Sequence, residues 1–452
     1  MSCCKVRFAP SPTGYMHIGN ARVAIINYLF CKKNNGKFLF RIDDTDSQRS
    51  KKEYEDAILY DLKWLGIKYD ETFRQSERLE RYKEVLQKLN EQNLVYKCFE
   101  TEDELEFKRK RAILKGKPPI YDREALKLTA SQINEFEKSG IPSYWRFKLP
   151  DETIQWNDMV LGDTSYNLSN ISDPVIAKSD GTFLYSFCSV IDDLDSNVTH
   201  ILRGQDHVTN TSAQIAMIEA ISGRRCQIKF GHFSLLINKD GSQFSKRLGS
   251  LNLGNLRNDG LDPMSIWNLL ATLGTSKDTC TFLDLDELAN YFDITSFGSN
   301  SPKFDVEQLF NLNKKIIREI SYDCLKKRIP LKMSERQYSV IKENIDNYND
   351  LIGWDNILSN GYNPNINCVN FDVITCFKHH LSKIDCDALS KDQAIELLSK
   401  VSNEMNIRGK SLHMPIQTVI LGLQKAPRLV DTLTIIPRKE ILRRLDTVLS
   451  RR

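Results

Sequence analysis

Blocks of apolar and polar residues near the start of the chain predict a strand, a loop, a helix and a second strand. Lys5–Phe8 has the composition of a short strand. A loop rich in proline and glycine follows, and the apolar run 21–31 then predicts a helix with Asn20 as its N-terminal cap. The run 37–42 predicts the second strand. Elements of this length form a βαβ unit, whose two strands are parallel.

The middle of the chain mixes both periodicities. Residues 50–93 are charged, with apolar positions at three- and four-residue steps that predict helices. Residues 94–182 contain short strand-like runs such as Tyr144–Leu149, and we expect them to form an insertion. The runs 182–190 and 198–202 predict buried strands that resume the α/β pattern.

Beyond about residue 255 the strand signals fade, and the pattern predicts helices to the end, as in 262–273 and 438–449. The full length of 452 residues exceeds what one hydrophobic core usually serves, so we expect several domains.

Composition places the chain among folded proteins without membrane spans. Hydrophobic residues make up 41% and charged residues 27%, and no stretch has the roughly 18 to 20 apolar residues of a spanning helix. The first residues lack the apolar core of a signal peptide, so we expect a cytoplasmic protein. The eleven cysteines are odd in number and never spaced as CxxC, which argues against a disulfide framework.

The net charge of +4 is unevenly distributed. Residues 401–452 contain ten Lys and Arg against four Asp and Glu, and 108–111 is a basic run. Such a distribution indicates contact with a polyanion, although a solvated helical surface is nearly as good an explanation of the tail.

The loop Pro10–Gly19 lies between the first strand and the helix, at the carboxyl end of the strand where a βαβ unit binds ligands. Free N–H groups at the start of a helix favour a phosphate, and His17 can donate a hydrogen bond to it. Gly19 allows a base or ribose to approach the backbone. An isolated histidine in a proline-rich turn would have no such role; the whole string in this position favours the phosphate site.

A second constellation occupies 240–250. Glycines flank two adjacent cations, Lys246 and Arg247, together with several hydroxyl groups. This is the chemistry of a loop that closes over a triphosphate. Alone, such a segment would more often be a basic surface loop. Its position on a later element of the same predicted sheet favours the triphosphate-binding role.

Six strings in order, RFAPSPTG…HIG, RIDDTD, SDGTFLY, VIDD, ILRGQDH and FSKR, strongly resemble bacterial-type glutamyl-tRNA synthetases, which are class I aminoacyl-tRNA synthetases. The resemblance spans essentially the whole chain. It implies an α/β fold: a Rossmann-like parallel-sheet catalytic domain with an inserted acceptor-binding domain, followed by all-α stem-contact and anticodon-binding domains.

The resemblance also implies a reaction and a set of site residues. Glutamate attacks the α-phosphate of Mg-ATP, and the glutamyl group then passes from the adenylate to the terminal ribose of tRNA. His17 and Lys246 match the catalytic positions. The matching ATP-binding residues are Pro10, Ser11, Pro12, Thr13, Gly14, His17, Gly19, Asn20, Phe244, Ser245, Lys246 and Arg247. The matching glutamate-binding residues are Arg7, Ala9, Ser11, Asp43, Tyr185, Arg203 and His207.

Arg7 maps onto the side-chain carboxylate of glutamate, which a planar guanidinium grips in a bidentate manner. Ser11 and Asp43 map near the ammonium group and backbone of the substrate. Singly, each of these residues has an ordinary structural explanation; Tyr185, for example, is compatible with a plain core aromatic.

Three positions depart from the family pattern. Asn20 takes the fourth place of the first signature, where it caps a helix well. Gln243 replaces the usual first lysine of the second signature, so one phosphate-facing cation is missing. Relatives that bind zinc have a Cys-x-Cys pair near Cys98 with further ligands near Tyr121; a single thiol cannot make that site, so we predict no structural zinc.

The resemblance implies a division of the chain by role. We expect a split catalytic domain, an acceptor-binding insertion, a stem-contact domain with the second signature loop, and two helical anticodon-binding modules. Their ranges are, in that order, 1–93 with 183–240, 94–182, 241–320, 321–378 and 379–452. The implied partners are L-glutamate, ATP with Mg²⁺ and tRNA(Glu); we expect a monomer without membrane contact.

Alternatives from more than one class stay open at this stage. Some relatives recognise the anticodon with an arginine in the first helical module, and none is found around 346–350, which leaves tRNA(Gln) open as a second substrate. An enzyme that charges mainly tRNA(Gln) with glutamate, or a direct glutaminyl enzyme, is the nearest rival. A non-catalytic tRNA-binding module would be expected to lack His17 or Lys246, and both are present.

Overall fold

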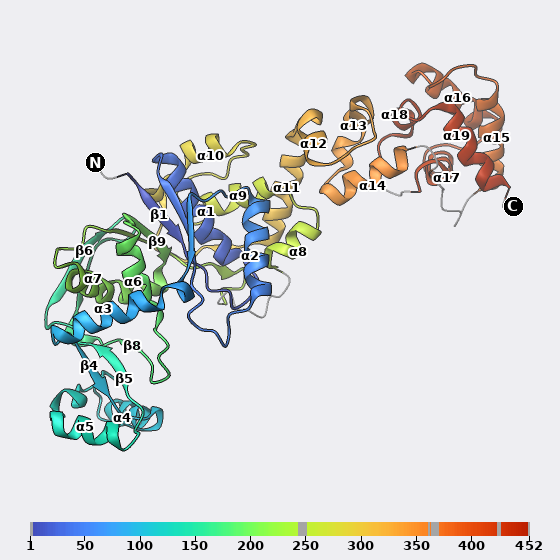
Figure 1. Cartoon of the computed structure of the whole chain (residues 1–452). Coiled ribbons are helices and arrows are strands. Elements are labelled where there is room, and N and C mark those ends of the chain that lie inside the picture. Colours follow the sequence, from blue (N-terminus) through green and yellow to red (C-terminus); the bar gives the residue numbers. More distant parts are fainter. Residues whose placement is uncertain (1–2, 243–250, 360–361, 363–369, 423–425, 451–452) are drawn as a thin grey trace. The chain divides into compact units, whose positions relative to one another are not determined.

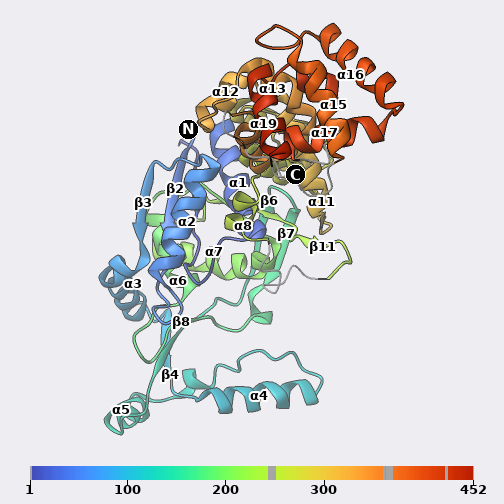
Figure 2. The same ribbon diagram turned by 90° about the vertical axis from the view of Figure 1, so that its right-hand side faces the viewer.

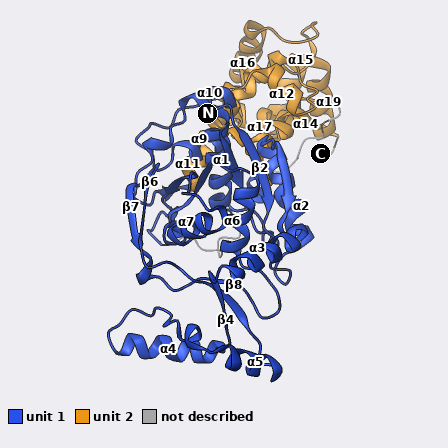
Figure 3. Ribbon diagram, turned by 60° about the vertical axis from the view of Figure 1, so that its left-hand side comes forward, with its two compact units in different colours: residues 1–256, 266–305 blue, residues 257–265, 306–452 orange. Residues whose placement is uncertain are grey.

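The computed structural model describes residues 3–242, 251–359, 362, 370–422 and 426–450. The described chain forms two compact units, residues 1–256 with 266–305 and residues 257–265 with 306–452 (Figure 3). This is a coarser division than the five segments expected from the sequence, whose boundaries stay predictions. Among the described residues, no helix is long and apolar enough to cross a membrane.

Parallel strands form the centre of the first unit, as predicted (Figure 1). One sheet has the order β1 (Lys5–Phe8), β2 (Lys37–Ile42) and β3 (Glu71–Arg74), and a second pair joins β9 (His200–Gly204) to β10 (Lys229–Phe233). The two groups meet where the Thr199 N–H donates to the Lys5 carbonyl over 2.9 Å. The carboxyl ends of β1 and β9 therefore face the same edge.

Helices connect these strands. They are α1 (Ile18–Lys33), α2 (Lys52–Leu65), α3 (Leu79–Glu91), α6 (Tyr185–Asp195) and α7 (Val208–Ser222). The core between them is aromatic and aliphatic, with Tyr82, Phe187, Met217 and Phe230 almost fully buried. The predicted strand at Lys5–Phe8 is confirmed, as is the one at 37–42.

The prediction of a strand over 182–190 is wrong, since this segment enters α6. Phe183, Phe187, Val190 and Ile191 are buried at helical spacing. A short apolar run does not by itself distinguish a buried strand from a buried helix. The preceding strand is β8 (Val175–Ala177), and the charged region 50–93 likewise contains β3 between its two helices.

The segment expected to be an insertion has two parts. An antiparallel sheet of β4 (Val95–Cys98), β5 (Tyr144–Phe147) and β8 bears the helices α4 (Glu102–Leu114) and α5 (Ala130–Lys138) at its far end (Figure 2). The hairpin β6 (Thr153–Asp158) and β7 (Gly162–Asn167) instead packs on β10, where the Met159 N–H donates to the Phe230 carbonyl over 2.8 Å.

The remainder is mainly helical, as predicted. The first unit ends with α8 (Leu253–Asn258), α9 (Pro263–Thr272) and α10 (Leu285–Tyr291), each of which lies wholly or partly within it, and with the two-residue strands β11 (Ile237–Asn238) and β12 (Lys303–Phe304). The second unit contains α11 (Val306–Glu319), α12 (Tyr322–Arg328), α13 (Glu335–Ile341), α14 (Tyr348–Leu358), α15 (Phe371–Ser382), α16 (Lys391–Met405), α17 (Lys410–Leu421), α18 (Leu429–Leu433) and α19 (Arg438–Leu449).

A buried cation ties the helices of the second unit together. The Arg444 side chain is fully buried, and it donates to Glu440 Oε1 over 2.7 Å and to the carbonyls of Ile420 and Ile357 over 2.7 and 2.6 Å. Part of the positive charge that the sequence places in the tail is therefore internal, and only the remainder can face an outside polyanion.

Replacing Arg444 by Ala should destabilise this unit by about 3 kcal/mol, because it leaves buried carbonyl groups and part of a buried ion pair without partners. Denaturant unfolding of the full chain measures the loss. Arg443→Ala is the matched control: this neighbour also pairs with Glu440 but is partly exposed, so its loss should stay below about 1 kcal/mol. Equal losses in the two variants would contradict the assignment.

Candidate active site

The loop after β1 and the segment after β2 lie together, as the βαβ unit predicts. The Asp43 N–H donates to the Pro10 carbonyl over 3.1 Å, and the Lys51 N–H donates to the Pro12 carbonyl over 3.0 Å. Within the loop, the Thr13 N–H donates to the Ser11 carbonyl over 2.8 Å. These bonds fix the loop against the carboxyl end of β2, and the Ser11 side chain stays exposed.

His17, and not Asn20, caps helix α1. Its Nδ1 accepts from the N–H groups of Gly19 and Asn20 over 3.0 and 3.3 Å. The prediction of Asn20 as the cap is therefore wrong, because the cap lies three residues earlier, at His17. The N–H groups of Gly19 and Asn20 thus donate to His17, although first-turn N–H groups were expected to face a phosphate.

The cap determines the protonation of the imidazole. Nδ1 accepts hydrogen bonds, so in the neutral ring Nε2 bears the proton and is the donor. Glycine at position 19 has a steric explanation, because a Cβ there would lie 2.9 Å from the His17 Cε1 atom. The helix start thus presents a histidine donor in a fixed tautomer.

A buried network of charges surrounds Arg41, whose side chain is fully buried. Its guanidinium bonds to Asp43 Oδ1 over 2.6 Å and to Asp193 Oδ1 over 2.9 Å. Asp193 also accepts from Nε of Arg7 over 3.3 Å. Asp192 lies 3.8 Å from Arg41. Arg7 and Asp43, two predicted site residues, are therefore joined through Arg41 and Asp193.

Burial makes this network costly to ionise, and its pKa values are shifted accordingly. Burial raises the pKa of Asp43 to about 6, although the adjacent Arg41 works in the opposite direction. Burial also raises the pKa of Asp192 against the effect of Arg41. The carboxyl of Asp43 thus titrates close to neutral pH.

A second group of predicted residues surrounds Arg203 at the end of β9. One guanidinium nitrogen lies 3.5 Å from the Tyr185 hydroxyl, and another donates to the His207 carbonyl over 3.4 Å. The rings of Tyr185 and His207 are 5.9 Å apart. Stronger bonds of 2.6 and 2.7 Å link Arg203 to Thr211 Oγ1 and Gln214 Oε1.

The two groups are close enough to interact electrostatically. Burial lowers the pKa of Arg203, and Arg7 lowers it further by like-charge repulsion. Both guanidinium groups lie in nearly dry surroundings, since each residue is 4% exposed. Arg7 is already paired with Asp193, whereas Arg203 makes no ion pair among the described residues, so a carboxylate ligand would be favoured beside Arg203.

The remaining predicted residues are less informative. Ala9 lies partly buried in the loop before Pro10, and Gly14 would have open space around an added Cβ. Phe244, Ser245, Lys246 and Arg247, like the departure at Gln243, lie outside the described residues.

Sequence reasoning did not assign a role to Arg41, Asp192 or Asp193. Their signal was present, because Arg41 begins the RIDDTD string and both aspartates end the VIDD string. Adjacent acidic residues inside apolar runs point to buried, paired carboxylates.

The region around Cys98 shows what occupies the place of the zinc site of some relatives. Cys98 Sγ lies 3.6 Å from the Tyr121 hydroxyl, which donates to Glu100 Oε1 over 2.7 Å. The guanidinium of Arg146 lies 4.1 Å from the centre of the Tyr121 ring. The prediction of no structural zinc here stays a prediction, and the cluster gives an alternative way to hold this fold together.

Elsewhere, one group among the described residues has the donors of a metal site. Cys376, His380 and Glu404 place one ligand atom each within 4.8 Å of one another, on α15 and α16. His380 Nε2 and Glu404 Oε2 are already hydrogen-bonded over 2.7 Å. This bond accounts for the cluster without an ion.

The basic run in α4 is partly neutralised. Lys108 pairs with Glu124 over 2.5 Å, and Arg109 pairs with Glu106 over 3.3 Å. Beside it, a cavity of about 450 Å³ is lined by Arg111, Lys115, Lys117 and Arg146 among others. Asp122 and Glu124 also line this cavity, so its charge is mixed, with an excess of basic side chains.

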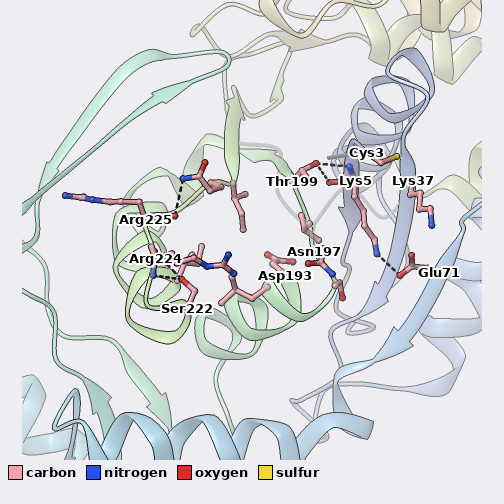
Figure 4. Close-up of a pocket in the computed structure, with 16 residues that line it drawn as sticks. Cys3, Lys5, Lys37, Glu71, Asp193, Asn197, Thr199, Ser222, Arg224 and Arg225 are labelled. Carbon is pink, nitrogen blue, oxygen red and sulfur yellow. Dashed lines mark hydrogen bonds and ion pairs between the residues drawn. The ribbon is translucent and has the colours of Figure 1, made fainter. Parts of the chain in front are cut away.

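A cavity of about 760 Å³ lies at the opposite edge of the parallel sheet (Figure 4). Its lining includes Lys5, Lys37 and Glu71, the first residues of β1, β2 and β3. Lys5 is paired with Glu71 over 2.6 Å. Since the predicted chemistry is at the carboxyl ends of the strands, this cavity is not the candidate active site.

Comparison with known proteins agrees with this geometry. A family model described as "tRNA synthetases class I (E and Q), catalytic domain" matches residues 4–311, and an "Anticodon binding domain" model matches residues 368–449. Glutamate–tRNA ligase 2 of Gluconobacter oxydans is 41% identical, and glutamate–tRNA ligase 1 of Maricaulis maris is 40% identical; each match covers 98% of both chains.

A solved structure of a glutamate tRNA ligase from Elizabethkingia meningosepticum, in complex with its amino acid, has the same fold. It matches with a TM-score of 0.79 and 24% identity, over 99% of each chain.

Substituting His17 should separate its role as a cap from its side-chain chemistry. His17→Ala removes the acceptor of two N–H groups and should cost about 1 kcal/mol in the free energy of unfolding. Asn is a good capping residue, so His17→Asn should keep most of that stability. Denaturant titration of both variants measures the difference, and an equal loss in both would disprove the cap.

Proposed function

The chain belongs to the class I tRNA synthetases of the E and Q family, and we propose that it is a glutamate–tRNA ligase. In this proposal it activates L-glutamate with ATP and transfers the glutamyl group to the 3′ terminal ribose of tRNA(Glu). The chemistry of the family depends on ATP. Direct charging with glutamine, and a role as a tRNA-binding module without catalysis, are less well supported, because the curated relatives are named as glutamate–tRNA ligases over the whole length of the chain.

The observation that carries the amino-acid choice is the pair of buried arginines, Arg7 and Arg203. Arg7 is partly compensated by Asp193, whereas Arg203 pairs with no carboxylate within the described ranges, so the two buried guanidinium groups carry a net positive charge. The negative side chain of glutamate relieves their repulsion. Neutral glutamine does not, because it cannot compensate the buried charges. We also assign Tyr185, His207 and Ala9 to this pocket; Tyr185 and His207 lie beside Arg203.

Asp43 is the partner that we assign to the substrate ammonium group, with Ser11 nearby. Its carboxylate is held by Arg41, which fixes the orientation of the acceptor oxygen atoms. The same contact prevents Asp43 from swinging toward Arg7. The pocket thus separates the substrate's positive end from its negative side chain.

Nucleotide binding is assigned to the loop 10–20 and to the second signature. His17 donates from Nε2 to a phosphate oxygen as negative charge develops there, and Lys246, which the family pattern assigns to the same step, supplies a cation. Pro10, Pro12, Thr13, Gly14 and Gly19 shape the backbone of the loop, while Phe244, Ser245 and Arg247 accompany Lys246. Mg²⁺ enters bound to ATP, as part of the substrate.

For tRNA, we assign the acceptor end to the insertion and the anticodon to the helical modules after residue 321. The basic cavity with Arg111, Lys115 and Arg146 supplies cations for phosphate groups, so binding should weaken with salt. Whether tRNA(Gln) is a second substrate follows from the anticodon module, where no arginine was found around 346–350. We expect the enzyme to act as a monomer, without structural zinc.

The test is charging of separate tRNA(Glu) and tRNA(Gln) transcripts with labelled glutamate and glutamine. We expect glutamate on tRNA(Glu), and a loss of about 100-fold or more in Lys246→Ala, because a phosphate-facing cation is removed. Lys68→Ala, which removes an exposed lysine between α2 and β3, is the matched control and should be fully active. Failure to charge either tRNA with glutamate at any salt concentration would refute the proposal.

The pKa of Asp43 predicts a pH dependence of glutamate use. The ammonium group needs the ionised carboxylate, so the KM for glutamate should rise as pH falls through about 6. Steady-state charging between pH 5 and pH 8 measures this step. Asp43→Asn should raise the KM and remove the step, whereas Asp44→Asn should keep it. The same step in Asp43→Asn would assign the titration to another group.

A further inference from the structure

We propose that Asp158 and His232 form a buried dyad that positions Arg203, and with it the selectivity of the pocket for a carboxylate. Neither residue belongs to the site residues expected from the sequence. The inference rests on the proposed function, because it assigns Arg203 to substrate glutamate. Both residues are positioning residues, since they act on the substrate only through the arginine.

The dyad starts from a carboxylate that the surrounding backbone holds in place. Asp158 lies at the end of β6 and is 2% exposed. Its Oδ1 accepts from the N–H groups of Val160, Leu161 and His232, over 3.1, 3.1 and 3.0 Å. Three backbone donors stabilise a charged carboxylate in the interior.

Its other oxygen bonds to the imidazole of His232, a residue of β10 that is 0% exposed. Asp158 Oδ2 lies 2.5 Å from His232 Nδ1. Burial opposes the charge on Asp158, but the bonds from His232 lower its pKa to about 2. Burial lowers the pKa of His232, and Arg203 acts in the same direction, although the bond to Asp158 opposes them. The pair is thus an ionised carboxylate and a neutral imidazole with its proton on Nδ1.

This tautomer leaves Nε2 of His232 as an acceptor aimed at Arg203. Nε of Arg203 lies 3.3 Å away, and the Thr211 hydroxyl lies 2.8 Å away. Thr211 and Gln214 hold the far side of the guanidinium. The imidazole therefore fixes the inner edge of the fork and leaves the side toward Tyr185, with its weak 3.5 Å contact, for a ligand.

The intervening imidazole has an electrostatic purpose. A carboxylate in direct contact with Arg203 would satisfy its fork and compete with the substrate. Within the described part of the chain, no carboxylate forms an ion pair with Arg203; Asp193 acts on it from a distance, and Asp158 lies behind the neutral ring. Arg41 shows the opposite arrangement, since three carboxylates surround it and leave no side of its guanidinium for a substrate carboxylate.

The dyad also joins two segments that are expected from the sequence to belong to different domains, the insertion 94–182 and the catalytic segment 183–240. Asp158 comes from the β6–β7 hairpin, within the segment expected to bind the acceptor end, whereas His232 and Arg203 lie on paired strands of the parallel sheet. The register places His232 directly beside Arg203. The hairpin is therefore part of the amino-acid pocket's support.

The experiment compares the full chain with His232→Phe, His232→Gln and Asp158→Asn, and measures the KM for L-glutamate and for ATP in charging. Phe keeps an aromatic ring but removes the hydrogen bonds to Asp158, Arg203 and Thr211, so the KM for glutamate should rise about 10- to 100-fold, as for a misplaced binding group. The KM for ATP should change less than about twofold. Gln offers an amide oxygen to Arg203 and should restore part of the loss. Asp158→Asn should raise the KM for glutamate less than His232→Phe.

His200→Phe is the matched control, because His200 is a partly buried histidine at the other end of β9 and contacts Thr199. Its KM for glutamate should equal that of the wild type. An unchanged glutamate KM in folded His232→Phe, or equal rises for ATP and glutamate, would overturn the proposal. If His232→Phe does not fold, Asp158→Asn decides the question by the same criteria.

Calorimetric titration of L-glutamate and the imidazole ¹⁵N spectrum do not depend on tRNA charging. They therefore test the dyad even if the proposed function fails in the charging assay. We expect weaker glutamate binding in His232→Phe than in His200→Phe. We expect His232 to be protonated on Nδ1 alone at pH 7 in the wild type. Protonation on Nε2 would overturn the dyad, even in an active enzyme.

Discussion

The candidate site depends on one constraint: a fully buried arginine, Arg41, must be compensated inside the protein. An isolated charge in the interior is very unfavourable, so Asp43, Asp192 and Asp193 are brought from two different elements to surround it. These contacts join the end of β2 to helix α6. Arg7 is then positioned through Asp193, and Asp43 is aligned for a substrate. Structure and specificity thus share one set of charges.

The fold was largely predictable because its strongest signals are local. Lys5–Phe8 and Arg438–Leu449 are elements whose observed bounds equal the predicted ones, since periodicity and turn residues define their ends. The error at 182–190 has the opposite cause. That run is apolar on several sides, because α6 lies in the core, and its periodicity is therefore weak over nine residues.

The site was only partly predictable, since sequence identifies residue types and not their partners. Arg7, Asp43 and Arg203 were identified from family strings, whereas several contacts that give them their properties join distant residues: Arg7 and Asp193 are 186 positions apart, and Arg203 and His232 are 29 positions apart. His232 is an example: nothing near it in sequence indicates Asp158 as its partner. The cap at His17 was missed because Asn is the commoner capping residue, and a histidine Nδ1 seldom serves this purpose.

The anchoring of the β6–β7 hairpin on β10 bears on how this chain can be recombined. An exchange of the whole segment 94–182 between relatives would replace the β6–β7 hairpin, including Asp158 and the residues around it. His232 would then contact a hairpin from another protein. A chimera that takes only the distal part, from β4 through α5 to β5, would keep the hairpin with its native sheet. The structural unit that can be exchanged is thus smaller than the stretch of sequence that interrupts the catalytic domain.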